Sequence, residues 1–277
     1  MKKKSNFFSQ KRQNFLKKSS DEPRKKKKFG QHFLRKQSVV NNMISRVTIT
    51  PQTSILEIGC GDGFLTQSIL NQTKCKQLLV YEIDSEWVEV VKNKIQDPRL
   101  NIKLENILDA DFSGFEQHKP WVILANLPYQ ITFPFMFLLQ RNKCLFQEGV
   151  IMIQEEVAQK IVATRGKKYS ATSIFLQHHF DLELLEKIEP GAFSPPPKVF
   201  SRLLYFKTKA KVASIPEEKG FWKFLKLCFI TPRKTLHNNL RTTHFDLNKI
   251  PEETQALRAQ QLSFNDLLSL WDLVRSD

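Results

Sequence analysis

A glycine-rich turn after a short apolar segment constrains the fold of this chain more than any other feature. Residues 54–58 predict a buried strand, and Gly59, Gly61 and Gly63 follow it closely. Glycine is needed where the backbone turns with positive φ or comes within contact distance of a ligand. The spacing matches neither the G-x-G-x-x-G of dinucleotide sites nor a P-loop, which argues against a nucleotide-triphosphate site. A purely structural strand-to-helix turn is the alternative.

Strands and helices alternate along residues 54–206. Apolar runs predict strands at residues 77–81, 101–105, 121–125 and 148–153, and helices at 64–70, at 85–95 with Ser85 as N-cap, and from 155 onward. This alternation predicts an α/β fold, a parallel sheet with helices on both faces, whose ligand lies at the carboxyl ends of the strands. After Pro195–Pro197, residues 199–206 predict an edge strand.

The rest of the chain divides by charge and pattern. Beyond residue 207 the pattern turns helical, with apolar-faced helices expected at 221–230 and 262–274. The net charge of +15 is concentrated at the start, where residues 1–28 carry 12 basic and 2 acidic side chains. We therefore expect a basic flexible tail over 1–28, an α/β domain over 29–206 and a small helical domain over 207–277. The tail is expected to be attracted to phosphates, and a solubilising or address-bearing extension is the alternative.

Several classes of protein are not expected. No apolar stretch of about 18 residues suggests a membrane span, and no apolar segment follows the basic N-terminus as a secretory signal requires. The four cysteines form no C-x-x-C pair, and no Cys/His cluster has zinc spacing, so we expect no metal site. Reduced thiols are typical of a cytoplasmic protein.

A carboxylate and an amide follow two of the predicted strands. Glu82 ends the second strand, where a carboxylate can accept both ribose hydroxyls of a nucleoside cofactor. The tetrapeptide Asn126-Leu127-Pro128-Tyr129 follows the strand over 121–125. The Asn126 amide oxygen and the Leu127 carbonyl, held by the stiff Pro128, could accept from an exocyclic amine and localise its lone pair. Tyr129 offers a flat face to a base. An ordinary Asn-Pro turn is the alternative.

With these motifs in register, the chain resembles the ribosomal small-subunit (16S) RNA adenine dimethyltransferases, the family of the bacterial kasugamycin-sensitivity enzyme. The resemblance runs from about residue 28 to the C-terminus and rests on several ordered segments. These are residues 29–34, the turn over 57–63, Glu82, the tetrapeptide at 126–129, and residues 192–199 and 258–263. The resemblance implies a Rossmann-like class I methyltransferase domain with a helical C-terminal domain. It also implies transfer of methyl groups from S-adenosylmethionine to the N6 amines of two adjacent adenosines in a hairpin loop near the 3′ end of small-subunit rRNA.

The resemblance also implies roles for individual residues. Asn126 and the Leu127 carbonyl would hold the target amine, and Tyr129 and Phe193 would sandwich the target adenine. Glu82 would hold the cofactor ribose, and Asn106 would lie beside the cofactor adenine. The residues implied to contact the cofactor are Gln31, His32, Leu34, Gly59, Gly61, Glu82, Ile83, Asn106, Ile107 and Asn126.

Two positions depart from the family pattern. The family usually has Asn where this chain has His32, and Asp where it has Asn106. Asn106 still offers an oxygen to an adenine amine, but without charge. Asp109 and Asp111 are nearby alternatives for this role. We expect these two departures to affect the affinity for the cofactor more than the class of reaction.

A basic stripe is predicted in the C-terminal part. Thr231 and Pro232 suggest an N-cap and a first helical residue. At 100° per residue the basic side chains that follow would share one face of a helix, as a phosphate-binding surface. A solvated helix face is the alternative. The stripe consists of Arg233, Lys234, His237 and Arg241.

Competing functions share the same architecture. A large-subunit rRNA adenine methyltransferase is the nearest, and a non-catalytic ribosome-assembly factor on a methyltransferase scaffold belongs to another class. Pro195–Pro197 and residues 258–263 favour the small-subunit enzyme. The intact glycine turn, Glu82 and Asn126–Tyr129 argue against loss of catalysis. We expect a monomer that acts on small-subunit rRNA within a 30S precursor and has no membrane partner.

Overall fold

The computed structural model describes Pro23 and residues 31–275. The predicted tail over 1–28, apart from Pro23, therefore lies outside the described residues. The strands are β1 Phe33–Leu34, β2 Ser54–Ile58, β3 Gln77–Glu82, β4 Leu100–Leu104, β5 Trp121–Asn126, β6 Phe146–Gln154, β7 Phe180–Ile188, β8 Phe193–Ser194 and β9 Ser201–Thr208. The α-helices are α2 Gln37–Ser45, α3 Phe64–Gln72, α4 Ser85–Lys94, α5 Thr132–Arg141, α6 Glu155–Ile161, α7 Ala171–His179, α8 Glu218–Cys228, α9 Leu236–Leu240, α10 Glu252–Gln255 and α11 Phe264–Val274.

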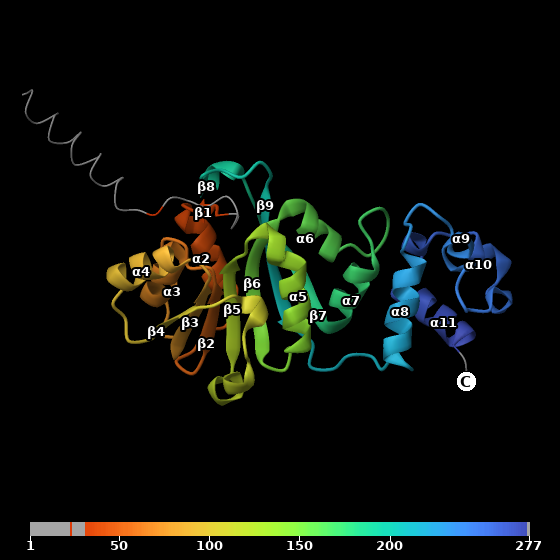
Figure 1. Cartoon of the computed structure of the whole chain (residues 1–277), viewed down its shortest axis with the longest axis horizontal. Coiled ribbons are helices and arrows are strands. Elements are labelled where there is room, and N and C mark those ends of the chain that lie inside the picture. The colour runs from red at the N-terminus through yellow and green to blue at the C-terminus, as the bar shows by residue number, and fades with distance from the viewer. Residues whose placement is uncertain (1–22, 24–30, 276–277) are drawn as a thin grey trace, which may run out of the picture.

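A seven-stranded sheet forms the centre of the α/β part, with helices on both of its faces (Figure 1). The strand order is β4-β3-β2-β5-β6-β9-β7, and the first five strands in this order run parallel. The apolar runs of β2, β3, β5 and β6 are buried on both faces of the sheet because helices cover both sides, which is typical of parallel sheets, whereas β4 at the edge is partly exposed. Two buried clusters of side chains follow, one on each face. The predicted α/β class is confirmed.

The predicted edge strand is wrong. β9 pairs antiparallel with β6 on one side and with β7 on the other, so it lies inside the sheet. The outer strand on this side of the sheet is β7, which the pattern did not predict because many of its residues are only partly buried. The three prolines at 195–197 precede β9 rather than interrupt it, so they leave its hydrogen bonds intact.

The N-cap of α4 also differs from the prediction. Asp84, not Ser85, occupies the N-cap position, and its side chain accepts a hydrogen bond from the Glu86 backbone N–H at 3.3 Å. Both residue types suit this position, so the sequence alone left a one-residue ambiguity.

The helices after β9 gather at one end of the molecule (Figure 1). Their apolar side chains form a third buried cluster, which also takes in Tyr169 and Ile174 and so joins these helices to the region of α7. Trp271 of α11 lies in this cluster and donates from its indole nitrogen to the Pro216 carbonyl at 2.8 Å. Within residues 31–275, no helix has both the length and the apolar character to cross a membrane.

Candidate active site

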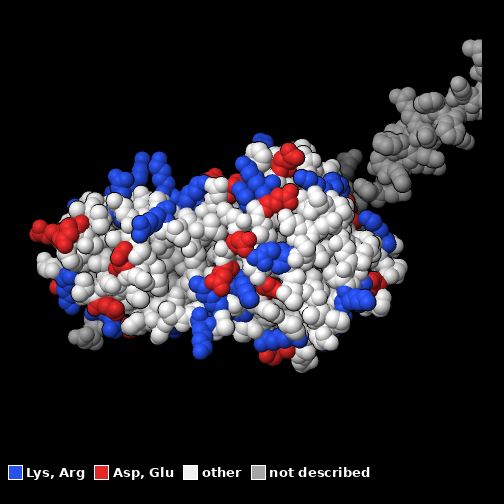
Figure 2. Space-filling view, turned by 180° about the vertical axis from the view of Figure 1, so that it is seen from behind, with Lys and Arg blue, Asp and Glu red and all other residues white. Residues whose placement is uncertain are grey.

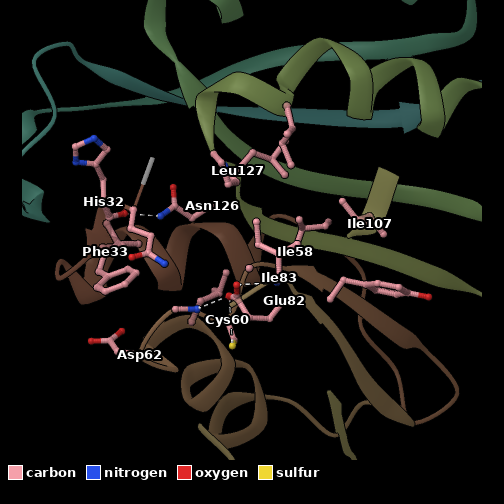
Figure 3. A pocket seen from close by; sticks show the side chains of 18 of the residues that line it. His32, Phe33, Ile58, Cys60, Asp62, Glu82, Ile83, Ile107, Asn126 and Leu127 are labelled. Carbon is pink, nitrogen blue, oxygen red and sulfur yellow. Dashed lines mark hydrogen bonds between the residues drawn. The ribbon is translucent and has the colours of Figure 1, made fainter. Parts of the chain in front are cut away.

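A pocket opens at the carboxyl ends of β2, β3, β4 and β5 (Figure 3). The segment around β1 closes one side of the pocket, and the tetrapeptide after β5 closes another. The pocket thus brings together residues that lie almost 100 positions apart in the chain. Of the residues predicted to contact cofactor or substrate, its lining includes Gln31, His32, Leu34, Gly59, Gly61, Glu82, Ile83, Asn106, Ile107, Asn126, Leu127, Pro128 and Tyr129.

The glycine turn has positive φ at each glycine: 75° at Gly59, 51° at Gly61 and 83° at Gly63. A Cβ at Gly61 would lie 2.9 Å from the Phe33 ring, so both the backbone conformation and the ring require glycine there. At Gly59 the nearest atom to such a Cβ is a carboxylate oxygen of Glu82, 4.0 Å away. The space at Gly59 therefore lies next to the Glu82 carboxylate and is not filled by side chains of the core.

Glu82 presents one weakly engaged oxygen to the pocket. Its Oε1 accepts from the backbone N–H groups of Ile83 and Asp84, each at 2.9 Å. Its Oε2 has only longer contacts, with the Gly61 N–H at 3.3 Å and the Cys60 Sγ at 3.7 Å. Burial raises the pKa of Glu82, and the hydrogen bonds from the Asp84, Gly61 and Ile83 backbones oppose that rise. The carboxylate is thus fixed at one oxygen and available at the other.

A second carboxyl group, that of Glu57, lies buried next to the turn. It is fully buried, and neither of its oxygens has a hydrogen-bond partner among the described residues. Burial raises the pKa of Glu57 to about 8; the nearby Thr66 hydroxyl opposes the rise, and the negative charge of Glu82 adds to it. An unpaired charge here would carry a large desolvation cost, so burial favours the neutral acid form of Glu57.

Asn126 is held in a defined orientation at the end of β5. Its amide Nδ2 donates to the His32 backbone carbonyl at 2.9 Å. Because a carbonyl can only accept, this bond distinguishes the amide nitrogen from the oxygen. Figure 3 shows the nitrogen turned toward His32 and the oxygen pointing away from it. The contact also links the segment before β1 to the predicted catalytic tetrapeptide.

Tyr129 is also fixed in place. Its hydroxyl lies 2.7 Å from the Ser201 Oγ at the start of β9. Burial raises the pKa of Tyr129, so its hydroxyl is neutral at pH 7. The His32 ring lies 6.1 Å from the Tyr129 ring with 26° between their planes, and the His32 Nδ1 is 2.9 Å from the Pro195 carbonyl. The tetrapeptide thus contacts both the N-terminal segment and the strand that follows the prolines.

Two predicted site residues lie differently from the rest. Phe193 is not among the residues that line the pocket. It pairs with Leu34 between β8 and β1, and its side chain is 5% exposed within a buried apolar cluster. Asn106 does line the pocket, but its Oδ1 accepts from the Leu108 N–H at 3.1 Å. The alternatives Asp109 and Asp111 are exposed and lie outside the pocket lining.

The helix predicted to begin after Thr231 and to carry the basic stripe does not form. α9 begins at Leu236, and its N-cap is Thr235, whose side chain accepts from the Asn238 N–H at 3.3 Å. Thr231 and Pro232 therefore do not start this helix. The four basic residues are exposed but lie on different local structures, with Arg233 and Lys234 in the preceding turn, His237 in α9 and Arg241 at its C-cap.

The sequence did not single out Phe33, which lines the pocket, or Asp84, which lies behind the lining. Phe33 lies under Gly61 and contacts the Trp87 ring edge-on, with the ring centroids 4.8 Å apart. The Asp84 Oδ2 accepts from the Gln31 Nε2 at 3.1 Å, which anchors the segment before β1. No local pattern marks these contacts because they join residues 28 to 54 positions apart.

Comparison with known proteins gives the family. A family model described as ribosomal RNA adenine dimethylase matches residues 22–274. A ribosomal RNA small subunit methyltransferase A of Mesomycoplasma hyopneumoniae (strain 232) is 35% identical over 259 residues, which cover 90% of this chain and 96% of that protein. The protein of the same name from Geobacter metallireducens is 35% identical over 232 residues, covering 81% and 83% of the two chains.

Solved structures show the same fold. A dimethyladenosine transferase from Plasmodium falciparum is 25% identical, with a TM-score of 0.70, and the match covers 86% of this chain and 96% of that one. The 23S rRNA methyltransferase ErmE is 19% identical with a TM-score of 0.67, covering 87% and 99%, a likeness of fold alone. Since the family model spans nearly the whole described chain, the protein belongs to the ribosomal RNA adenine dimethylase family.

Proposed function

We propose that this protein transfers methyl groups from S-adenosylmethionine to the N6 amines of two adjacent adenosines in a hairpin loop near the 3′ end of small-subunit rRNA, giving N6,N6-dimethyladenosines. Family membership and the names of the relatives support the reaction and the substrate. The observation that carries the proposal is the pairing of two groups in one pocket. The Asn126 amide is oriented by the His32 carbonyl, and the Glu82 carboxylate has one oxygen with only long hydrogen bonds to the protein.

The pocket fits the proposed methyl donor. The Glu82 Oε2 can accept from ribose hydroxyls, because its hydrogen bonds to the protein are long. The open space at Gly59 admits the ligand beside it, and Ile83 and Ile107 offer apolar surface to an adenine ring. Asn106 would stand at the edge of that ring. When bound there, S-adenosylmethionine supplies an electrophilic methyl group on a sulfonium that leaves readily.

The protein's own task is to prepare the amine that is methylated. The Asn126 Oδ1 and the Leu127 carbonyl would accept from the adenine N6 amine, which localises its lone pair on nitrogen and orients it. Tyr129 would stack on the base, which must leave its own stack to enter the pocket. The free-energy cost of unstacking is small in a hairpin loop because the bases of the loop are already partly unstacked. Phe193, buried in this structure, would have to move to take part in stacking.

Contact with rRNA beyond the pocket is proposed for the C-terminal helical part over 207–277. Figure 2 shows Lys and Arg side chains gathered along one edge of this part. The exposed Arg233, Lys234, His237 and Arg241 would contact phosphates from the turn and from α9. A monomeric state, a 30S precursor as the particle recognised and a cytoplasmic location stay predictions.

Methyl incorporation from labelled S-adenosylmethionine tests the proposal. We expect incorporation into immature small subunits by the wild type and none above background by Asn126→Ala, which keeps the fold and still binds the cofactor through the other pocket residues. Transfer by Asn126→Ala near the wild-type rate would contradict the role of Asn126. Incorporation into large-subunit RNA instead would favour the alternative methyltransferase, and binding of subunits without any incorporation would favour an assembly factor.

A further inference from the structure

Phe200 is exposed beside the active site without an obvious structural reason. Its side chain is 45% exposed, and the preceding Val199 is 43% exposed. Among the Phe, Tyr and Trp residues that the structure describes, Phe200 is the only exposed one. An exposed aromatic ring beside a binding site offers a flat face on which a base can stack.

The backbone places Phe200 just before β9, at the end of the sheet where the pocket opens. β9 runs antiparallel to β6, so the start of β9 lies at the carboxyl ends of β6 and β5. The Phe200 carbonyl accepts from the Glu155 N–H at 2.9 Å, and the next residue, Ser201, contacts the Tyr129 hydroxyl at 2.7 Å. Two strand spacings, roughly 10 Å in all, separate β9 from β5, where Asn126 lies. A neighbouring nucleotide of a bound RNA loop would have to bridge this backbone spacing to reach the Phe200 ring, which lies against Lys187 of β7.

Positive charge accompanies the ring. The Lys187 Nζ lies 4.2 Å from the Phe200 ring centroid, and Lys198 is exposed two residues before the ring. The nearest other cation along the strand, Arg202, is engaged by Glu155 at 2.8 Å. A flat apolar ring with adjacent lysines combines the two elements that bind a single-stranded nucleotide, a stacking face and a phosphate contact.

We propose that Phe200 and Lys187 form a second nucleotide position, in which Phe200 stacks on the base next to the target adenosine and Lys187 contacts the adjoining phosphate. This inference rests on the proposed function, because the pocket must receive an adenosine for a neighbouring base to reach Phe200. The position holds the loop open and thereby helps to deliver the target base to Asn126 and Tyr129. Phe200 is a positioning residue, since it does not touch the reacting amine.

The first test uses an RNA hairpin with two adjacent adenosines in its loop. We expect Phe200→Ala to weaken RNA binding roughly 5- to 150-fold, the effect of losing one stacked base. Phe200→Trp should bind as the wild type does, whereas Phe200→Leu, which keeps apolar bulk without a flat ring, should bind like Phe200→Ala. Wild-type affinity in Phe200→Ala, or in Phe200→Leu, would overturn the proposal. The melting temperature and the affinity for S-adenosylmethionine should be unchanged in all three variants, which separates RNA binding from folding.

The second test removes the partner base. In hairpins that carry an abasic nucleotide on one side or the other of the target adenosine, the loss caused by Phe200→Ala should disappear for one of the two sides. An equal loss on all hairpins would show that Phe200 acts in some other way. Lys187→Gln should flatten the salt dependence of log Kd by about 0.7, one phosphate contact, and the matched variant Lys92→Gln on α4 should not. If the wild type methylates no RNA, the proposed function fails; if it does and Phe200→Ala binds normally, only this inference fails.

Discussion

Replacing Glu82 by glutamine should weaken cofactor binding without unfolding the protein. The side-chain oxygen of the variant would stay where Oε1 lies, because the Ile83 and Asp84 N–H groups both donate to that position. The new amide nitrogen would then replace Oε2. There it would face the Gly61 N–H, 3.3 Å from Oε2 in the wild type, and it could no longer accept from a ribose hydroxyl.

The magnitude follows from the loss of a charged acceptor. A hydrogen bond to a charged group contributes about 1.5–3 kcal/mol, so the Kd for S-adenosylmethionine should rise roughly 10- to 150-fold. The fold should tolerate the change because the two short backbone hydrogen bonds to Glu82 are retained. The measurement is calorimetric titration with S-adenosylmethionine in the absence of RNA, where no turnover occurs, with a melting curve of each variant.

Glu105→Gln is the matched control for this experiment. Glu105 also lines the pocket with a carboxylate, so its variant removes the same charge from the same cavity. We expect its Kd to stay close to that of the wild type. A Kd for Glu82→Gln within about twofold of the wild type would refute the reasoning, and so would equal losses in both variants, since these would indicate a general effect of charge.

Three further predictions concern stability and RNA binding. Because Glu57 keeps its proton up to about pH 8 in the folded protein but loses it above about 4.5 when unfolded, its contribution to stability should fall between these values by up to about 1.4 kcal/mol per pH unit. Melting curves at several pH values should show this as a difference in stability between the wild type and Glu57→Gln that falls as the pH rises, because the lowered pKa of His179 and the raised pKa of Glu82 act in both proteins. Gly61→Ala should cost about 1–2 kcal/mol for the left-handed backbone and about 1–3 kcal/mol for overpacking against Phe33, and denaturant unfolding with little change in stability would contradict this. Arg233→Glu combined with Lys234→Glu should weaken rRNA binding and flatten its salt dependence in titrations at several ionic strengths, and an unchanged slope would count against a phosphate contact.

The parallel strands could be predicted because their signal is local. A run such as residues 121–125 is continuously apolar, and β5 covers the same residues with one more at its end. β7 shows why other elements could not be predicted, since its partly buried faces carry Asp, Glu and Lys among the apolar residues. Without β7, residues 199–206 looked like an edge strand, although the structure places β9 inside the sheet.

In the pocket, too, residues marked by a local sequence pattern could be predicted, whereas contacts between residues far apart in the chain could not. The glycine turn and Glu82 lie at strand ends, so parallel-sheet geometry alone brings them together. The bond from Asn126 to the His32 carbonyl joins residues 94 positions apart, and no local pattern predicts it. Phe193 likewise needed three-dimensional information, because its side chain is buried through the pairing of β8 with β1. The helix expected after Thr231 starts at Leu236 instead, since Thr231 and Thr235 are equally good N-caps by type.

This pocket is expected to dimethylate two adjacent adenosines of small-subunit rRNA. The most direct measurement incubates the protein and S-adenosylmethionine with small subunits from cells that lack this modification, then locates N6,N6-dimethyladenosine in the rRNA by mass spectrometry. We predict two adjacent dimethyladenosines in the hairpin loop near the 3′ end, absent when Asn126→Ala replaces the wild type. No modified adenosine there, or modification only in large-subunit RNA, would contradict the account.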